Sequence, residues 1–245
     1  MIAALLSLAL SQATYYTPQE AQSVFAQAND AYYKQDFSTA KVGYLKLLDH
    51  GMGGPDVLFN LGTACLAAGE LGEAVVYLER ARRLSREDDI EANLSYARKL
   101  RVDQVVGAGN DEAFFERLVR ATDERELSLT FLICWWGGFA LLVARRWLVR
   151  GRLLAATLGG GLLFLGASSG AAVAAHAWVA RTIIEGVVLP ATAQVREFPG
   201  ENAKVAFEVH SGLKVRLMEE SGKFARIRLP NGLEGWTQID GVTQL

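Results

Sequence analysis

The clearest pattern in the chain is a pair of apolar stretches, at residues 128–144 and 153–180, that contain no Asp, Glu, Lys or Arg. At about 1.5 Å per helical residue, the first covers roughly 26 Å and the second exceeds the ~30 Å hydrocarbon core of a bilayer. Neither has the polar stripe of a helix on a soluble protein. The pattern predicts a transmembrane α-hairpin over residues 127–180, with helices at 127–146 and 153–176. A buried helix pair in a soluble protein is the alternative.

The connection between the two stretches is short and basic, with Arg145, Arg146, Arg150 and Arg152. Basic residues in short loops stay preferentially on the cytoplasmic side of a membrane. We therefore expect a two-helix protein of the inner (cytoplasmic) membrane, with its N- and C-terminal domains periplasmic or extracytoplasmic. In the second stretch, Gly166 and Gly170 have the GxxxG spacing that lets two helices pack closely.

The first 13 residues, MIAALLSLALSQA, are apolar and end in small residues, which predicts a signal peptide cleaved after Ala13. No Lys or Arg precedes the apolar run, and the run is short. An uncleaved segment, or a start codon assigned at the wrong place, explains these departures equally well.

Residues 14–101 show a helical pattern that repeats after 34 residues. Small or apolar residues recur at this offset: Ala28, Ala40, Tyr44 and Leu47 precede Gly62, Ala74, Leu78 and Ala81. A period of this length is typical of helical repeats, and NLGTACLAAGELGEAVVYLERA resembles the tetratricopeptide (TPR) repeat. Gly69 occupies the turn between the helices, where the earlier unit has Gln35. A third unit begins at EANLSYARKL without an evident second helix, so we expect its first helix to cap an α-helical TPR solenoid.

TPR arrays bind partner proteins on the concave surface formed by the first helix of each unit. The resemblance therefore assigns a partner-binding face to Phe25, Asn29, Tyr32, Phe59, Asn60, Thr63 and Asn93. The asparagines there can bond to a partner's backbone, or they can bridge helices within the array. Residues 102–126 are expected to form a linker and a juxtamembrane amphipathic helix. Its apolar face, with Phe114, Phe115, Leu118 and Val119, lies in the lipid interface or packs on the last repeat.

Residues 182–245 change to the period of two that is typical of β-strands. Asn231-Gly232 between two such runs predicts a hairpin, because both residues tolerate positive φ. The stretch VREFPGENAKVAFEVHSGLKVRLMEESGKFARIRLPNGLEGWTQI resembles a bacterial SH3-type domain, which implies a small all-β barrel that binds peptides, proteins or cell-wall material. We expect Phe207 and Trp236 in its core, and its ligand-binding loop at Glu197, Phe198 and Asn202.

The charge balance and the placement of cysteines and histidines argue against several classes of function. The net charge is −2, but residues 14–126 contain 13 basic and 19 acidic residues, which argues against nucleic acid as a partner. Cys65 and Cys134 lie too far apart in the predicted elements to form a disulfide, and no spacing indicates a metal site. The three histidines share no neighbourhood with other catalytic groups. We therefore expect a protein that is not an enzyme, with no cofactor and no metal; a membrane enzyme centred on His176 is the alternative.

The order of these parts, with a signal segment, TPR units, a two-helix hairpin and an SH3-type domain, resembles BatE-like proteins of the Bacteroides aerotolerance operon. ANLSYARKLRVDQV and VREFPGENAKVAFEVHSG carry the resemblance best. It implies a membrane-anchored scaffold at the cell envelope that works beside von Willebrand A-domain proteins and a MoxR-type ATPase. A protein that senses or anchors the cell wall through peptidoglycan is the alternative.

Overall fold

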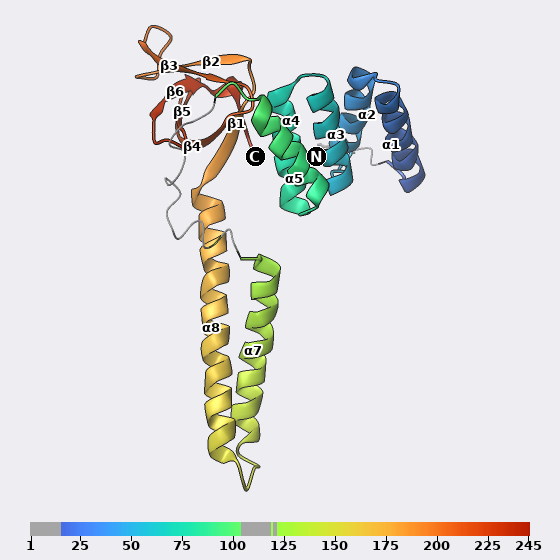
Figure 1. Cartoon of the computed structure of the whole chain (residues 1–245). Helices are drawn as coiled ribbons and strands as arrows, with labels where there is room; N and C mark the ends of the chain where they lie inside the picture. The colour runs from blue at the N-terminus through green and yellow to red at the C-terminus, as the bar shows by residue number, and fades with distance from the viewer. Residues whose placement is uncertain (1–15, 104–118, 120–121) are drawn as a thin grey trace, which may run out of the picture. The chain divides into compact units, whose positions relative to one another are not determined.

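A computed structural model describes residues 16–103, 119 and 122–245 (Figure 1). The chain divides into two compact units, of which one combines the N-terminal helices with the C-terminal sheet and the other contains the two long apolar helices. The expected signal peptide at residues 1–13 and most of the expected linker at 102–126, including Phe114, Phe115 and Leu118, lie outside the described residues.

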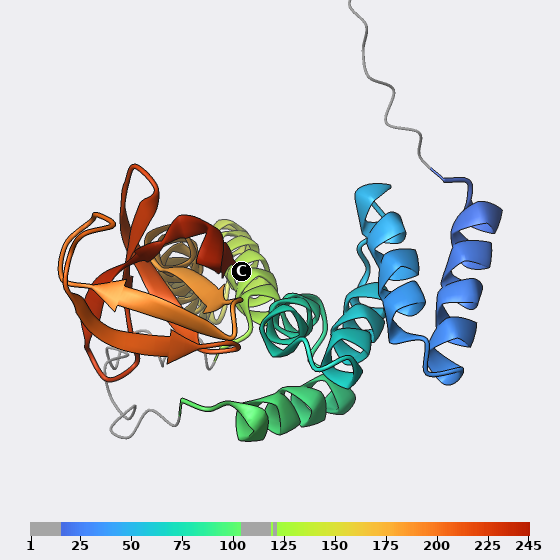
Figure 2. The ribbon, with the colours of Figure 1, turned by 90° about the horizontal axis from the view of Figure 1, so that it is seen from above.

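The first unit begins with consecutive helices that pack side by side (Figure 2). They are α1 (Pro18–Tyr33), α2 (Phe37–Asp49), α3 (Pro55–Ala67), α4 (Leu71–Leu84) and α5 (Asp88–Leu100). Thr17 begins α1 with a capping box that it forms with Glu20, and the Asp36 carboxylate caps α2 by accepting from the Thr39 backbone N–H.

The 34-residue offset corresponds to two equivalent helix pairs, α1 with α2 and α3 with α4. All eight residues at the matching positions are buried. A side chain at Gly62 would place its Cβ 2.7 Å from Leu78, and one at Gly43 would place it 2.7 Å from the Cβ of Ala28. Small residues therefore recur because the helices of each pair approach closely at these points.

The turns inside the two pairs have the same backbone conformation despite their different residues. Gln35 has φ of 63° and Gly69 has φ of 80°. The residue after each turn donates its backbone N–H to a carbonyl five residues earlier, from Asp36 to Ala31 and from Glu70 to Cys65, each at 2.9 Å. The first turn therefore keeps a geometry that favours glycine while a glutamine occupies it.

The C-terminal part of the first unit is one seven-stranded sheet with the order β3-β2-β6-β5-β4-β1-β7. Because β3 and β7 are edge strands, the sheet does not close into the expected barrel. Its strands are β1 (Ile184–Val188), β2 (Thr192–Arg196), β3 (Val205–His210), β4 (Lys214–Ser221), β5 (Phe224–Arg228), β6 (Glu234–Gln238) and β7 (Val242–Gln244), with a 3₁₀ turn at Ile239–Gly241.

Two details of the sheet differ from the prediction. β5 and β6 form the expected antiparallel pair around Asn231 and Gly232, but only Gly232 has positive φ, at 85°. Asn231 contributes through its side chain instead, which accepts from the Leu233 backbone N–H at 3.2 Å. Phe207 and Trp236 are only half-buried and so were wrongly expected in the core. Smaller residues such as Val195 and Ile227 fill it.

The second unit is dominated by α7 (Glu124–Ala144) and α8 (Arg152–Thr182), both long and apolar enough to cross a membrane. α7 starts three residues before the expected span, and α8 continues six residues past it, so that α8 has 31 residues and a length of about 46 Å. Many of their bulky apolar side chains are exposed: within the described chain, Ile133 is 71% exposed and Phe164 is 76% exposed.

Glycines line the contact between α7 and α8. A Cβ at Gly159 would lie 3.1 Å from the Gly138 carbonyl oxygen, and a Cβ at Gly138 would lie 2.9 Å from the Gly159 carbonyl oxygen. Further along α8, Gly166 approaches the Trp135 backbone N, and Gly170 approaches the Phe131 ring, each at 3.1 Å from the added Cβ. Small residues thus let the two backbones pack closely.

Candidate functional site

The residues assigned to the partner-binding face lie on three helices of the first unit: Phe25, Asn29 and Tyr32 on α1, Phe59, Asn60 and Thr63 on α3, and Asn93 on α5. The rings of Phe25 and Tyr32 are partly buried and pack against the core shared by α1, α2 and α3. Phe59 packs against the next core, which includes Leu58 and Leu78. The three helices therefore hold these side chains in fixed positions.

The polar members of this face bridge neighbouring helices. Asn29 Oδ1 accepts from the Tyr44 hydroxyl at 2.6 Å and from Asn60 Nδ2 at 3.2 Å. Burial raises the pKa of Tyr44 to about 12, so its hydroxyl keeps the proton that it donates. Asn93 Nδ2 donates to Thr63 Oγ1 at 2.9 Å, which links α5 to α3.

These contacts leave hydrogen-bonding capacity for a partner. Within residues 16–103, the Asn29 Nδ2 group donates no side-chain hydrogen bond and Asn60 Oδ1 accepts none. One asparagine thus offers a donor and the other an acceptor, which is what a partner's peptide group requires. Bridging the helices and binding a backbone are compatible roles for these residues.

A pocket of about 760 Å³ lies at the end of this face, where α1 and α3 begin. It is lined mainly by apolar side chains, from Phe25 on α1, Leu47 and Leu48 at the end of α2, Met52 in the following loop and Val57 on α3. Asp56, in the first turn of α3, is the charged residue of the lining. The volume of the pocket lies in the range of ligand-binding pockets, roughly 300–1,000 Å³.

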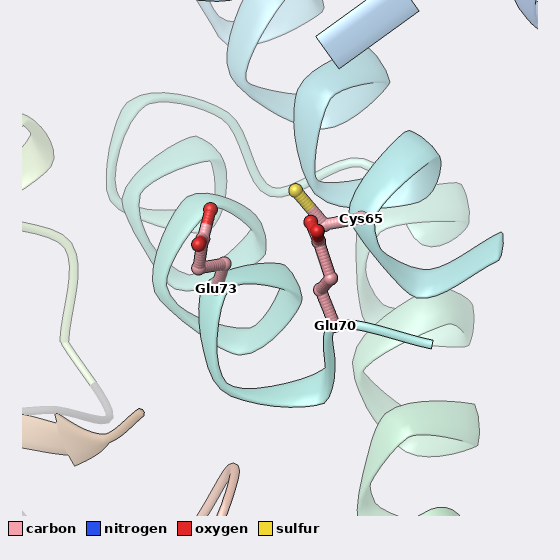
Figure 3. A group of neighbouring side chains, drawn as sticks. All are labelled: Cys65, Glu70 and Glu73. Atoms are coloured by element: carbon pink, nitrogen blue, oxygen red, sulfur yellow. The ribbon is translucent and has the colours of Figure 1, made fainter. Parts of the chain in front are cut away.

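Cys65, Glu70 and Glu73 form a second cluster, between α3 and α4 (Figure 3). Their donor atoms lie within 4.8 Å of one another, the spacing of a metal site. However, the Lys41 ammonium group already contacts both carboxylates, at 2.7 Å each. Burial lowers the pKa of Lys41, but its hydrogen bonds to Glu70 and Glu73 outweigh this effect and raise it, so the group stays charged.

The Cys65 thiol of this cluster is unsuited both to nucleophilic attack and to metal binding. Cys65 is fully buried, and burial raises its pKa to about 12. A thiolate is the form that attacks electrophiles and binds metals. The cluster therefore acts as a salt bridge that joins the first helix pair to the second.

On the sheet, the loop residues assigned to ligand binding lie between β2 and β3. Phe198 is 68% exposed, Asn202 is exposed, and Glu197 forms an ion pair with Lys204 at 3.4 Å. The structure thus places an exposed aromatic ring at this loop, well suited to stacking on a ligand.

The helices and the sheet of the first unit share a hydrophobic core that sequence reasoning missed. Val75, Val76 and Ala97 from α4 and α5 pack against Val187 of β1. Gly72 is equally close to the sheet, because a Cβ there would lie 2.8 Å from the Leu189 Cα. The helical array and the sheet are therefore one packed body.

A buried carboxylate lies beside this shared core. Glu79 on α4 is 2% exposed, and its oxygens contact Arg82 at 2.7 Å and Lys214 of β4 at 3.2 Å. The Asp103 carboxylate accepts from the backbone N–H and from the ring Nδ1 of His210, at 2.6 and 2.8 Å. These contacts link α4 and the residue Asp103 after α5 to the sheet.

In the second unit, His176 near the end of α8 lies 2.9 Å from the Thr122 hydroxyl oxygen through Nε2. The Thr122 hydroxyl donates its single proton to the Val119 carbonyl, also at 2.9 Å. His176 Nε2 must therefore be the donor to Thr122. This contact links Thr122, just before α7, to α8.

No protein-family model matches the sequence, and no curated protein shows significant similarity to it. The features that bear on function are two helices long and apolar enough to cross a membrane, a helical array with a polar row and a pocket, and a sheet packed against that array.

Proposed function

We propose that this protein is a membrane-anchored, non-enzymatic scaffold that recruits partner proteins to the cell envelope. One observation carries the proposal: α7 and α8 are long, apolar and exposed over most of their length within the described chain. A buried core helix of a soluble protein would instead hide its apolar side chains. Lipid is the environment that covers such a surface on an isolated hairpin.

The proposed topology follows from the charges. The four arginines between α7 and α8 would hold the loop in the cytoplasm. The parts of the chain before and after the hairpin would then lie on the opposite side of the inner membrane from the cytoplasm, in the periplasm or its equivalent. The helical array, with the TPR-like period, and the sheet, with its SH3-like sequence, would face the same compartment.

In this proposal, the face around Asn29 and Asn60 binds protein partners. The resemblance to BatE-like proteins suggests von Willebrand A-domain proteins and a MoxR-type ATPase as components of the same system. A second candidate function is the binding of peptidoglycan by the sheet, because the exposed ring of Phe198 is suited to stacking on sugars.

Photocrosslinking in intact cells tests the scaffold. A photoreactive amino acid replaces Gln22 at the rim of the pocket, and a matched control replaces Val42, which is 51% exposed on α2 and does not line the pocket. We expect discrete protein adducts from position 22 and none from position 42. Equal adducts at both positions, or none at either, would contradict the proposal.

Sedimentation with purified peptidoglycan separates the two candidate functions. A scaffold that binds only proteins stays in the supernatant. If the whole protein sediments with peptidoglycan, and Phe198→Ala releases it, the second function is correct.

A further inference from the structure

The pocket at the start of α1 and α3 continues directly into the polar row. On α1, Phe25 lines the pocket and Asn29 follows four residues later; on α3, Asp56 lines the pocket and Asn60 follows four residues later. Residues at this spacing share a helix face and lie about 6 Å apart along the axis. An extended peptide advances by about 6.6 Å in two residues, which matches this step.

The helices α1 and α3, which carry the pocket and the polar row, contain acidic but no basic residues. α1 contains Glu20 and Asp30, and α3 contains Asp56, whereas neither helix contains a Lys or Arg. The outer helix α2, by contrast, contains both signs, with Lys41, Lys46 and Asp49. Asp30 is paired with Lys34 in the turn after α1.

Asp56 is the acidic residue best placed to meet a ligand. It is exposed, it lines the pocket, and within residues 16–103 it forms no ion pair. A ligand with a cationic group beside the pocket would therefore gain an attraction that no side chain of the described array already satisfies.

We infer that the pocket binds an apolar side chain of a partner protein in a segment that also contains Lys or Arg beside that side chain. The apolar group enters among Phe25, Leu47 and Val57. The cationic group pairs with Asp56, and the following peptide group bonds to Asn29 and Asn60. This inference rests on the proposed function, since it gives the chemistry of the partner at the same face.

Fluorescence anisotropy with the full-length protein in detergent micelles tests the inference. The probes are three labelled peptides: GSKKLFKKSG, GSEELFEESG and GSKKGGKKSG. We expect the first to bind and the others to bind at least tenfold more weakly, because one lacks the cations and the other lacks the apolar anchor. Equal binding of the acidic peptide would overturn the inference.

Two substitutions locate the binding site. Asp56→Asn should weaken binding of the first peptide about 3- to 5-fold, the range for an exposed ion pair. Its matched control is Asp88→Asn, an exposed aspartate in the first turn of α5, which should leave the affinity unchanged. Ala21→Trp, which fills the pocket, should abolish binding while circular dichroism and melting temperature stay near the wild-type values. Equal effects of Asp56→Asn and Asp88→Asn, or normal binding to a folded Ala21→Trp protein, would contradict the inference.

The crosslinking experiment keeps the two proposals distinguishable. Protein adducts from position 22 together with no binding of the basic peptide would refute the partner chemistry and leave the scaffold standing. No adducts and no peptide binding would refute both.

Discussion

At the scale of single residues, the turn that ends α1 keeps its conformation although its residue departs from the repeat pattern. The repeat predicts glycine at position 35, and the sequence has glutamine there. The structure nevertheless keeps positive φ at Gln35, as at Gly69. The helix packing on either side determines the turn, and the residue adapts to it at a cost in conformational energy.

Gln35→Gly should therefore stabilise the protein. A left-handed conformation costs a residue with a Cβ about 1–2 kcal/mol, and part of the gain is lost to the greater freedom of glycine in the unfolded chain. We expect the free energy of unfolding to rise by about 0.5–1 kcal/mol, measured by urea denaturation followed by circular dichroism. The reverse change at the equivalent turn, Gly69→Gln, should lower it by a similar amount. A loss of stability in Gln35→Gly would show that the turn is not strained.

Residue-level prediction succeeded where the signal was local and failed where a partner was distant. The small residues at positions 28, 40, 62 and 74 could be predicted from their spacing, since all four are buried where neighbouring helices of the array pack together. Glu79 could not be recognised as a buried ion, because Lys214 lies in a different element far along the chain. Sequence periodicity contains no information about such pairs.

At the scale of elements, composition predicted both apolar helices, but their contact was only partly predictable. The GxxxG spacing drew attention to Gly166 and Gly170, whereas the two backbones also come close at Gly138 and Gly159. Gly159 lies in a run of three glycines, and sequence alone cannot tell which of them faces α7. The choice depends on the rotation of α8 about its axis, which packing determines.

Adjacent glycines provide a matched test of this packing. Gly159→Leu should separate the helices, because a Cβ there meets the Gly138 carbonyl and Leu142 at 3.1 Å. Gly160→Leu should be tolerated, since nothing lies within 4 Å of its Cβ position. In detergent micelles, we expect the first variant to melt at a lower temperature than wild type and the second to match it. A Gly160→Leu protein as unstable as Gly159→Leu would refute the arrangement.

At the scale of the whole molecule, the shared core of helices and sheet changes the picture that the sequence suggests. The sequence predicts two independent modules joined by a hairpin. The structure instead makes the array and the sheet one unit, whose core includes Val76, Ala97 and Val187. In the sequence, the hairpin therefore lies between two parts of one folded unit. The proposed membrane topology agrees with this connectivity, since it places both ends of the hairpin in the same compartment.

The ionic contact beside this core should stabilise the body as a pair. Lys214→Met leaves the buried Glu79 with Arg82 as its cationic partner and should lower the free energy of unfolding by about 1–3 kcal/mol. Replacing both Glu79 and Lys214 by Met should recover most of that loss. Lys204→Met, which removes an exposed ion pair with Glu197, should change the free energy of unfolding by less than about 0.5 kcal/mol. Urea denaturation checks all three; equal effects of Lys204→Met and Lys214→Met would argue against the shared body.

Cysteine labelling in cells whose cytoplasmic membrane is intact tests the central claim most directly. Single cysteines replace Lys34 in the array, Lys223 in the sheet and Leu148 in the arginine-rich loop, and a membrane-impermeant maleimide is added. The parent protein gives the background, which should be low because Cys65 and Cys134 are buried and burial raises the pKa of Cys65 to about 12. We predict that positions 34 and 223 react at once and that position 148 reacts only after the membrane is permeabilised. Labelling of position 148 in intact cells, or opposite results at positions 34 and 223, would contradict the account.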